Sequence, residues 1–166
     1  MNNKKGARRV KVSTKGRYAL RLMIDMSLHN TGDYVLLKEI SERQQISIKY
    51  LEQIVGHLCR AGYLKSLRGP KGGYKLTRPP SEYTVGDILR VTEGNIVPVS
   101  CLETQPNDCA RYGKCAAVEF WQGLQAVINE YVDATTIEDL AQKQLRLSPE
   151  EYACASRQKN SKVMNV

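Results

Sequence analysis

The chain has 166 residues, five cysteines and a formal net charge of +8. This length can bury a core without disulfides, the cysteine count is odd, and no apolar run is long enough to cross a bilayer. Because no apolar signal segment follows Met1, we expect a cytoplasmic chain with reduced thiols rather than a secreted or membrane protein. The charge is uneven: residues 1–80 hold 17 Lys and Arg against 5 Asp and Glu, and residues 81–166 hold 8 against 12. A basic half predicts contact with a polyanion, unless the excess only solubilises the surface.

The N-terminal region predicts a basic arm followed by a helix. Residues 1–12 contain five Lys and Arg but few apolar side chains. We therefore expect a flexible arm that either contacts phosphates or is simply solvated. Ser13 or Thr14 can cap the helix, because a hydroxyl accepts from the free N–H groups of a first turn. Apolar residues at helical spacing continue this helix to about Asn30.

Residues 36–62 predict a helix-turn-helix. One short helix is expected from Leu36 to about Gln44. Ser47 then caps a second helix, which Gly62 closes and whose apolar face is formed by Leu51, Ile54, Val55 and Leu58. Two helices joined by so short a turn are typical of DNA-binding proteins, although many helical hairpins share the pattern.

The segment after these helices predicts a β-hairpin. Residues 63–67 and 74–77 are β-compatible, and the stretch between them contains three glycines and a proline, which permit a sharp, stiff turn. Arg68 and Lys71 leave cations at its tip. A helix-turn-helix followed by a basic hairpin is the plan of a winged-helix DNA-binding domain, here residues 13–80. In such a domain the second helix enters the major groove and the wing reaches the backbone or the minor groove.

The predicted DNA contacts follow from the helix face that remains free. The apolar face must pack inward, so side chains near the N-terminus of the second helix are left to contact DNA. Gln53 can pair with adenine, Glu52 can accept from cytosine, and Arg68 can read a narrow minor groove. Glu52 has an alternative role, because the helix dipole favours an acid in the first turns. The predicted DNA-binding residues are Ser47, Lys49, Tyr50, Glu52, Gln53, Arg68, Gly69 and Lys71.

The second half of the chain predicts further helices. Thr84 and Asp87 have the spacing of a capping box, so residues 81–98 are expected to hold a connecting helix. Residues 116–147 are expected to form a dimerisation helix and a short last helix, because apolar residues recur at alternating steps of four and three. The alternative is an ordinary core helix, and residues 148–166 are predicted to be a flexible tail. The apolar stripe consists of Trp121, Leu124, Ile128 and Tyr131, widened by Phe120, Val127 and Val132.

Residues 99–115, which we call the thiol loop, contain three cysteines in the pattern C-x7-C-x5-C. This pattern differs from the C-x2-C pairs of common zinc modules. The polar segment between the cysteines can wrap a larger body, and thiolates are soft ligands that suit iron–sulfur clusters. We therefore interpret Cys101, Cys109 and Cys115 as cluster ligands. A zinc site and unligated, redox-active thiols are the alternatives.

Several strings resemble the IscR-like family of winged-helix regulators: STKGRYALRLM, LKEISERQQISIKYLEQIVGHL and RGPKGGYKLTRP, followed by three cysteines and a helix with a tryptophan. The resemblance covers residues 10 to about 145. It implies a homodimeric transcription factor; some members ligate an iron–sulfur cluster, whereas relatives without the cysteines regulate cysteine metabolism through a protein partner. It also implies that Arg68 lies in the wing, that the three cysteines ligate the cluster, and that the recognition helix carries Ser47, Lys49, Tyr50, Glu52 and Gln53.

The fourth cluster ligand is left open by the sequence. In cluster-binding relatives it can be a His three residues after the last cysteine, or an Asp from the partner's first helix. These positions hold Val118 and Arg17 here. An oxygen or exchangeable donor would hold iron less firmly than a thiolate, which suits a sensor. The candidates are Glu103, Asp108 and Glu119, followed by Asn107 and then by Cys59 and Cys154.

Together these features predict a mainly α-helical fold with a small β-hairpin wing and a long dimerisation helix. We expect a homodimeric, sequence-specific regulator that binds a palindromic site in double-stranded DNA and responds to an iron–sulfur cluster, [2Fe-2S] in preference to [4Fe-4S]. Catalysis is not expected, because His29 and His57 have no nucleophile or acid pair nearby. One alternative is a cluster-independent regulator that acts through a thiol switch or a partner enzyme. The other is a small iron–sulfur redox protein.

Overall fold

The computed structural model describes residues 12–69, 72–104, 107 and 109–149. The predicted basic arm except for its last residue, the tail from residue 150, and the predicted site residues Lys71, Asp108 and Cys154 lie outside this description. The elements are α1 (Thr14–Leu28), α2 (Leu37–Gln44), α3 (Ile48–Arg60), β1 (Leu64–Leu67), β2 (Gly73–Leu76), η1 (Pro80–Glu82), α4 (Val85–Glu93), η2 (Ser100–Leu102), η3 (Tyr112–Lys114), α5 (Ala117–Ala134) and α6 (Ile137–Leu147). The predicted fold class, mainly helical with a two-stranded wing, is confirmed.

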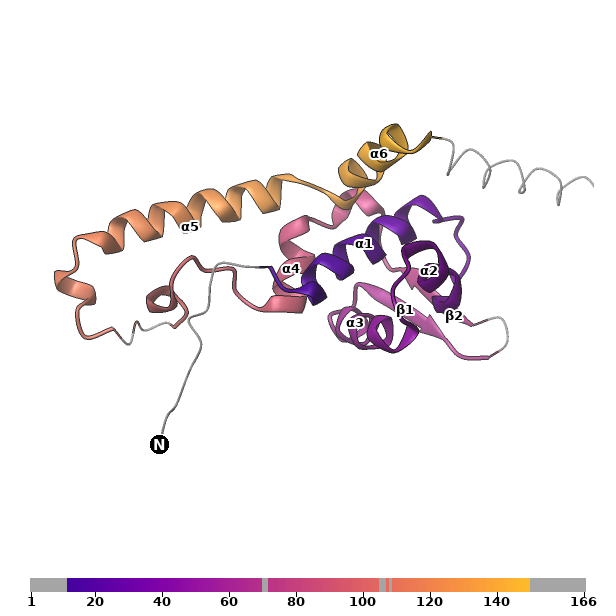
Figure 1. The fold of residues 1–166 in the computed structure, drawn as a ribbon, viewed down its shortest axis with the longest axis horizontal. Helices are drawn as coiled ribbons and strands as arrows, with labels where there is room; N and C mark the ends of the chain where they lie inside the picture. The colour runs from indigo at the N-terminus through magenta and orange to yellow at the C-terminus, as the bar shows by residue number, and fades with distance from the viewer. Residues whose placement is uncertain (1–11, 70–71, 105–106, 108, 150–166) are drawn as a thin grey trace, which may run out of the picture.

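Helices α1, α2 and α3 enclose one hydrophobic core together with the wing (Figure 1). On α1 the buried apolar residues recur at the spacing of one helix face, which is why this segment is an amphipathic helix. Tyr83, just before α4, is fully buried in the same core. The main apolar contributors are Ala19, Leu22, Met23 and Met26 from α1, Ile40 from α2, and Leu51, Ile54, Val55 and Leu58 from α3.

Helix α3 is bounded at both ends by hydrogen bonds between residues close in sequence. The Ser47 side chain accepts a hydrogen bond from the Tyr50 N–H, as the sequence predicts. At the other end Ala61 is the cap residue and Gly62, predicted as the cap, follows it with φ of 76°. The Gly62 and Tyr63 N–H groups donate to Cys59 and Leu58 at 3.0 and 2.9 Å, which is a Schellman motif.

The wing is an antiparallel hairpin that is tied back to the helices. Leu64 pairs with Leu76 and Leu67 with Gly73. Val35 and Tyr74 exchange two backbone hydrogen bonds of 2.9 Å, so the segment before α2 extends the sheet. A side chain at Gly73 would collide with the Val35 carbonyl, and glycine therefore permits this close approach.

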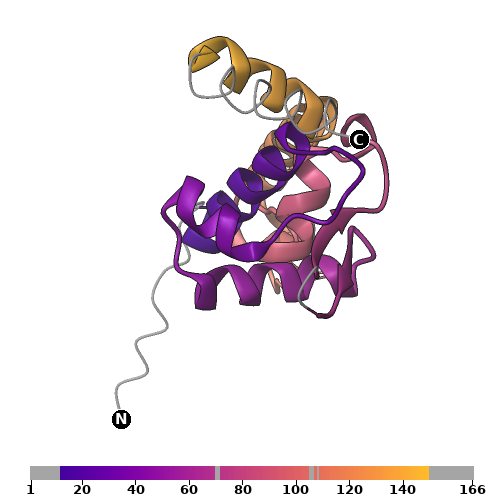
Figure 2. The ribbon, with the colours of Figure 1, turned by 90° about the vertical axis from the view of Figure 1, so that its right-hand side faces the viewer.

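Helices α4 and α6 begin side by side. Both have a capping box, the predicted one of Thr84 with Asp87 and a second of Thr136 with Asp139. Residues Thr84 and Thr136 form an antiparallel bridge, and the fully buried Ile137 inserts into the core. Helix α6 consequently lies against α1 (Figure 2).

Helix α5 extends away from the winged-helix domain, with the end of the thiol loop at its far end (Figure 1). It contains no buried residue in this single chain. Its C-terminal end is held by Arg90 of α4, whose Nη1 and Nη2 donate to the two Asp133 carboxylate oxygens at 2.7 Å. This guanidinium lowers the pKa of Asp133 below its usual value. No helix among the described residues is long and apolar enough to cross a membrane.

Candidate DNA-binding surface and thiol loop

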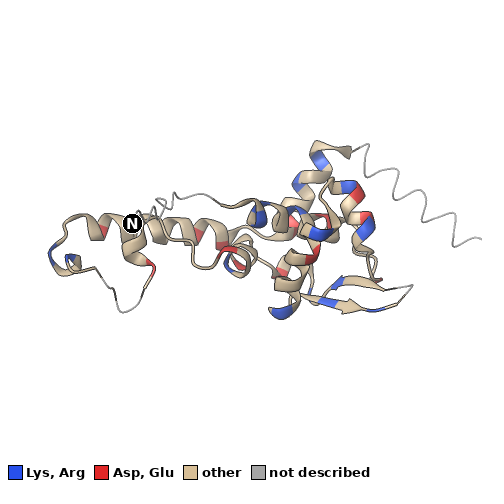
Figure 3. Cartoon of the chain, turned by 60° about the horizontal axis from the view of Figure 1, so that its bottom comes forward, with Lys and Arg blue, Asp and Glu red and all other residues tan. Residues whose placement is uncertain are grey.

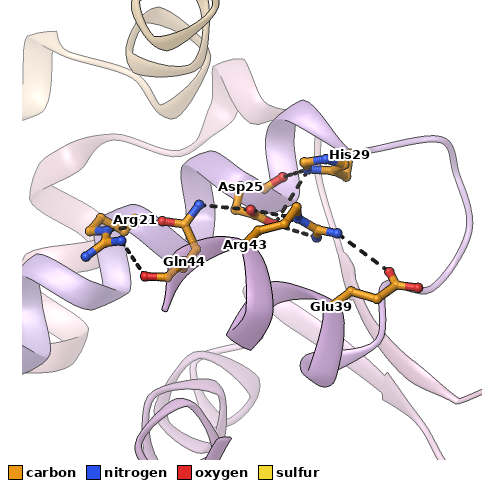
Figure 4. A network of polar contacts seen from close by, with 6 residues as sticks. All are labelled: Arg21, Asp25, His29, Glu39, Arg43 and Gln44. Atoms are coloured by element: carbon orange, nitrogen blue, oxygen red, sulfur yellow. Dashed lines mark hydrogen bonds and ion pairs between the residues drawn. The ribbon is translucent and has the colours of Figure 1, made fainter. Parts of the chain in front are cut away.

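The helix-turn-helix is anchored to α1 by a buried carboxylate (Figure 4). The Asp25 side chain has 0% exposure. Arg43 donates to it through Nη2 at 2.7 Å and through Nε at 3.0 Å, and Gln44 Nε2 donates at 2.9 Å. His29 Nδ1 lies 3.6 Å from the same carboxylate. Because Arg43 and Gln44 are the last residues of α2, Asp25 determines where the turn toward α3 begins.

The turn itself is held by further side-chain contacts. Arg21 of α1 donates to the Gln44 carbonyl oxygen at 2.5 Å, and Ser41 donates to the Ile46 carbonyl at 2.6 Å. Gln45 has the left-handed conformation with φ of 53°, which non-glycine residues adopt only where the surroundings compensate the strain. The turn therefore has one defined geometry, and α3 leaves it in a defined direction.

The structure presents most of the predicted recognition residues to solvent. Ser47, Lys49, Glu52 and Gln53 are exposed. Tyr50 is half-buried, and its ring packs edge-on against Tyr18 of α1 with centroids 5.5 Å apart. Sequence reasoning assigned Tyr50 only to the DNA face and missed this packing, since nothing in the local pattern indicates it.

In the wing, Arg68 differs from two other cations, Lys75 and Arg78. Arg68 and Gly69 are exposed where β1 ends. Lys75 donates to the Gly32 carbonyl, and the Arg78 guanidinium stacks on Tyr63 and Tyr83, at 5.1 and 4.7 Å from the ring centroids. Lys75 and Arg78 thus hold the wing to the domain, and Arg68 is available at its outer end. Figure 3 shows Lys and Arg on the winged-helix domain, whereas α5 has Asp and Glu but no Lys or Arg.

The thiol loop holds its cysteines in short turns. Cys101 lies in η2 and Cys115 follows η3, and all three thiols are half-buried. The Asn107 side chain accepts from the Cys109 N–H at 2.8 Å and donates to the Cys101 carbonyl, so it ties two cysteine backbones together. The proposed fourth-ligand positions Glu103 and Glu119 are exposed.

The donors of the thiol loop suit iron–sulfur chemistry, since three soft thiolates are available on one short segment. Among the described residues, however, no three His, Cys, Asp or Glu side chains lie together as a site for a single metal ion. The weaker candidate Cys59 packs against the core from α3, and burial raises the pKa of its thiol. That environment is typical of a structural cysteine rather than of a ligand.

Comparison with known proteins identifies the family. Residues 12–143 match the model of Rrf2, described as an iron-dependent transcriptional regulator. The chain belongs to the Rrf2 family. It is 42% identical over 132 residues to the HTH-type transcriptional regulator CymR of Bacillus subtilis, covering 80% of this chain and 90% of the relative. It is 35% identical over 131 residues to the regulator IscR of Vibrio atlanticus, covering 79% of this chain and 75% of the relative.

Solved structures of Rrf2 regulators have the same fold. That of B. subtilis CymR, named as the global cysteine regulator, is 41% identical and covers 80% of this chain and 97% of its own, with a TM-score of 0.66. That of T. potens IscR is 36% identical and covers 81% and 88%, with a TM-score of 0.63. The resemblance inferred from the sequence is confirmed, and this Rrf2 protein is a transcriptional regulator. Relatives of both types match, so the comparisons support a cysteine-type and an IscR-type regulator equally.

The Asp25 network should be a major source of stability. We expect Asp25→Ala to lower the free energy of unfolding by about 3–5 kcal/mol, because Arg43 and Gln44 lose the buried carboxylate to which they donate. Asp133→Ala is the matched control: it removes the same bidentate arginine pair at an exposed position, where about 1 kcal/mol or less is expected. Urea unfolding of both variants measures the difference, and equal losses would contradict it.

Proposed function

We propose that this Rrf2 regulator is a homodimer that binds a palindromic DNA site and changes its affinity with the state of an iron–sulfur cluster on the thiol loop. The observation that carries DNA binding is the exposed, polar N-terminus of α3, together with the exposed Arg68 where β1 ends. The start of α3 is held by the Asp25 network and by the Ser47 cap, which gives its exposed side chains the defined position that matching a DNA groove requires. The charge of residues 1–80 supplies attraction to phosphates.

The proposed contacts divide by chemistry. Gln53 and Glu52 offer acceptors and donors to base edges in the major groove, whereas Ser47 and Lys49 suit phosphates. Tyr50 contributes to the same surface, and its packing on Tyr18 fixes its position. In the wing we assign Arg68, Gly69 and Lys71 to the backbone or the minor groove.

Arg68 provides the direct test of the wing. Replacing Arg68 with Ala should weaken operator binding by about 1–3 kcal/mol if the side chain enters a groove. Arg146→Ala, on the exposed side of α6, removes the same charge away from the proposed surface and should change the Kd little. Titrations by fluorescence anisotropy at one salt concentration compare the two, and equal affinities would remove Arg68 from the DNA-binding surface.

Helix α5 supports the proposed homodimer. Its outer stripe of Phe120, Leu124, Val127 and Tyr131 is exposed, with Phe120 at 64% and Tyr131 at 74%. These positions follow steps of four and three, whereas the predicted Trp121, Ile128 and Val132 form a neighbouring, half-buried stripe. A continuous apolar stripe on a projecting helix requires cover, and a second copy related by two-fold symmetry supplies a matching one. Two recognition helices would then suit a palindromic site.

A charge in the middle of this stripe should separate the protomers. We expect Val127→Glu to raise the dimer Kd roughly 100-fold or more, because an unpaired carboxylate would have to be buried. Ala126→Glu places the same charge roughly 100° around the helix, outside the stripe, and should leave the dimer intact. Sedimentation velocity over a concentration series distinguishes these outcomes. A dimeric Val127→Glu variant would place the interface elsewhere.

The composition of the thiol loop is the evidence for the proposed iron–sulfur cluster. Cys101, Cys109 and Cys115 would supply three thiolates, and the exposed Arg111 and Lys114 would offset the negative charge of the cluster. When bound, the cluster would supply sensitivity to iron, to cluster supply or to oxidants. We propose [2Fe-2S] in preference to [4Fe-4S], with the fourth donor among Glu103, Asp108 and Glu119.

Cluster removal tests this proposal directly. Protein purified without air should show iron–sulfur absorption and Mössbauer signals, and variants of the three cysteines should lose both. Chelation of the iron should change the operator Kd several-fold at fixed salt, because ligation orders the thiol loop and the segments joined to it. Identical affinities with and without the cluster would refute the coupling. Separate substitutions of Glu103, Asp108 and Glu119 identify the fourth ligand by an altered spectrum.

The similarity to CymR favours a second candidate function. In this alternative the chain regulates without a cluster, through a thiol switch or a partner enzyme. Air-free protein would then be colourless and would bind its operator fully without iron. Treatment with an oxidant, or addition of an enzyme of cysteine metabolism, would change that binding instead.

A further inference from the structure

The C-terminal end of α4 holds the N-terminal end of α1. Glu93 is the last residue of α4, and its Oε1 accepts from the Gly16 N–H at 2.8 Å and from the Ser13 hydroxyl at 2.5 Å. The Gly16 N–H belongs to the first turn of α1, whose donors have no partner within the helix. A carboxylate at this position also interacts favourably with the helix dipole. The start of α1 therefore depends on a side chain 77 residues further along the chain.

The absence of a side chain at position 16 makes this contact possible. A Cβ atom on Gly16 would lie 2.7 Å from Glu93 Oε1 and 2.9 Å from Val12 Cγ1. Real Cβ atoms do not approach other atoms so closely, so any larger residue must displace the carboxylate or Val12. The contact between Glu93 and α1 is thus specific to a glycine at this position.

On one side, Glu93 precedes the thiol loop in the chain. Gly94 ends α4 with φ of 83°, and the chain then runs to Cys101 without another helix before η2. Cys101 follows Glu93 by eight residues. A change in the backbone at Cys101 can therefore reach Glu93 through a short, non-helical segment.

On the other side, the start of α1 adjoins the DNA-binding surface. Tyr18 lies two residues after Gly16 and packs edge-on against Tyr50, in the first turn of α3. The Arg21 guanidinium lies 5.6 Å from the Tyr18 ring centroid and donates to the Gln44 carbonyl at the turn. The first half of α1 consequently contacts both the recognition helix and the turn that precedes it.

We infer that Glu93 is a positioning residue, through which the segment leading to Cys101 sets the start of α1 and thereby the recognition helix. This inference rests on the proposed function, since it names the path by which the thiol loop acts on DNA binding. The path lies within one chain and passes through α4 and α1. It is separate from any change in the spacing of two protomers through α5.

The test compares operator affinity with and without the cluster in the full-length protein. For each variant, the Kd is measured on air-free protein and again after chelation of iron, at one salt concentration. The wild-type ratio of these constants reports the coupling. In Glu93→Ala we expect the ratio to fall to within about twofold of one, while couplings between sites are typically about 5- to 150-fold. Iron content and absorption should match wild type, because Glu93 acts by position.

Further variants separate positioning from general loss of structure. Glu93→Gln retains an oxygen that accepts from Gly16 and Ser13, and it should keep at least half of the coupling on a logarithmic scale, since only the charge is lost. Gly16→Ala should reproduce Glu93→Ala from the opposite side of the contact. If either Ala variant does not fold, Ser13→Ala removes one donor to the same oxygen and should lower the ratio in part. Glu82→Gln, at an exposed position, is the control and should keep the wild-type ratio.

The outcomes distinguish the two proposals. A wild-type ratio of one refutes the cluster coupling itself, and this inference with it. A wild-type ratio well away from one that persists in Glu93→Ala and Gly16→Ala refutes only the path through Glu93. Loss of iron in Glu93→Ala would make Glu93 a ligand and would also overturn the positioning role.

Discussion

A charge buried away from water constrains the whole winged-helix domain. Asp25 cannot leave its partners without a large penalty, because an unpaired carboxylate in a core is strongly unfavourable. Its partners Arg43 and Gln44 end α2, and the left-handed Gln45 follows directly. The direction of the recognition helix is thereby coupled to α1. Earlier in α1, Tyr18 packs on Tyr50 of α3 and Arg21 donates to the Gln44 carbonyl at the turn, so the position of α1 is linked to that of α3 at both levels.

The second half of the molecule has the opposite character. Helix α5 is anchored at its C-terminal end. There Arg90 donates two hydrogen bonds to the Asp133 carboxylate, and the Val85 N–H donates to the Thr135 carbonyl at 2.8 Å. The remainder has an uncovered apolar stripe and carries the thiol loop at its start. A region with few buried contacts has low local stability, so binding of a ligand or partner changes its conformation at little energetic cost. A rigid DNA-binding domain joined to such a region is suited to a regulator, since under the proposed function a change in the thiol loop would be passed on by the rigid domain.

Predictions from the sequence succeeded where the cause is local. Ser47 and Thr84 cap their helices through neighbours within three residues, and the hairpin follows from its glycines and β-compatible runs. The side chains that hold the domain together were missed, because their partners are remote. Asp25 pairs with Arg43, 18 residues away. Nothing near Tyr50 indicates that its ring packs on Tyr18, and the role of Glu93 depends on a glycine in another helix.

The sequence by itself determined helices α1 to α6, the wing, the family and the spacing of the three cysteines in the thiol loop, since each depends on residue type at short spacing. Only the tertiary structure decided which polar side chains are free to bind and which are already engaged. It separated Arg68 from Lys75 and Arg78, and it gave Asn107 a role between Cys101 and Cys109. The physical reason is that a polar group's availability depends on the partners that folding brings to it, and these lie far away in the chain.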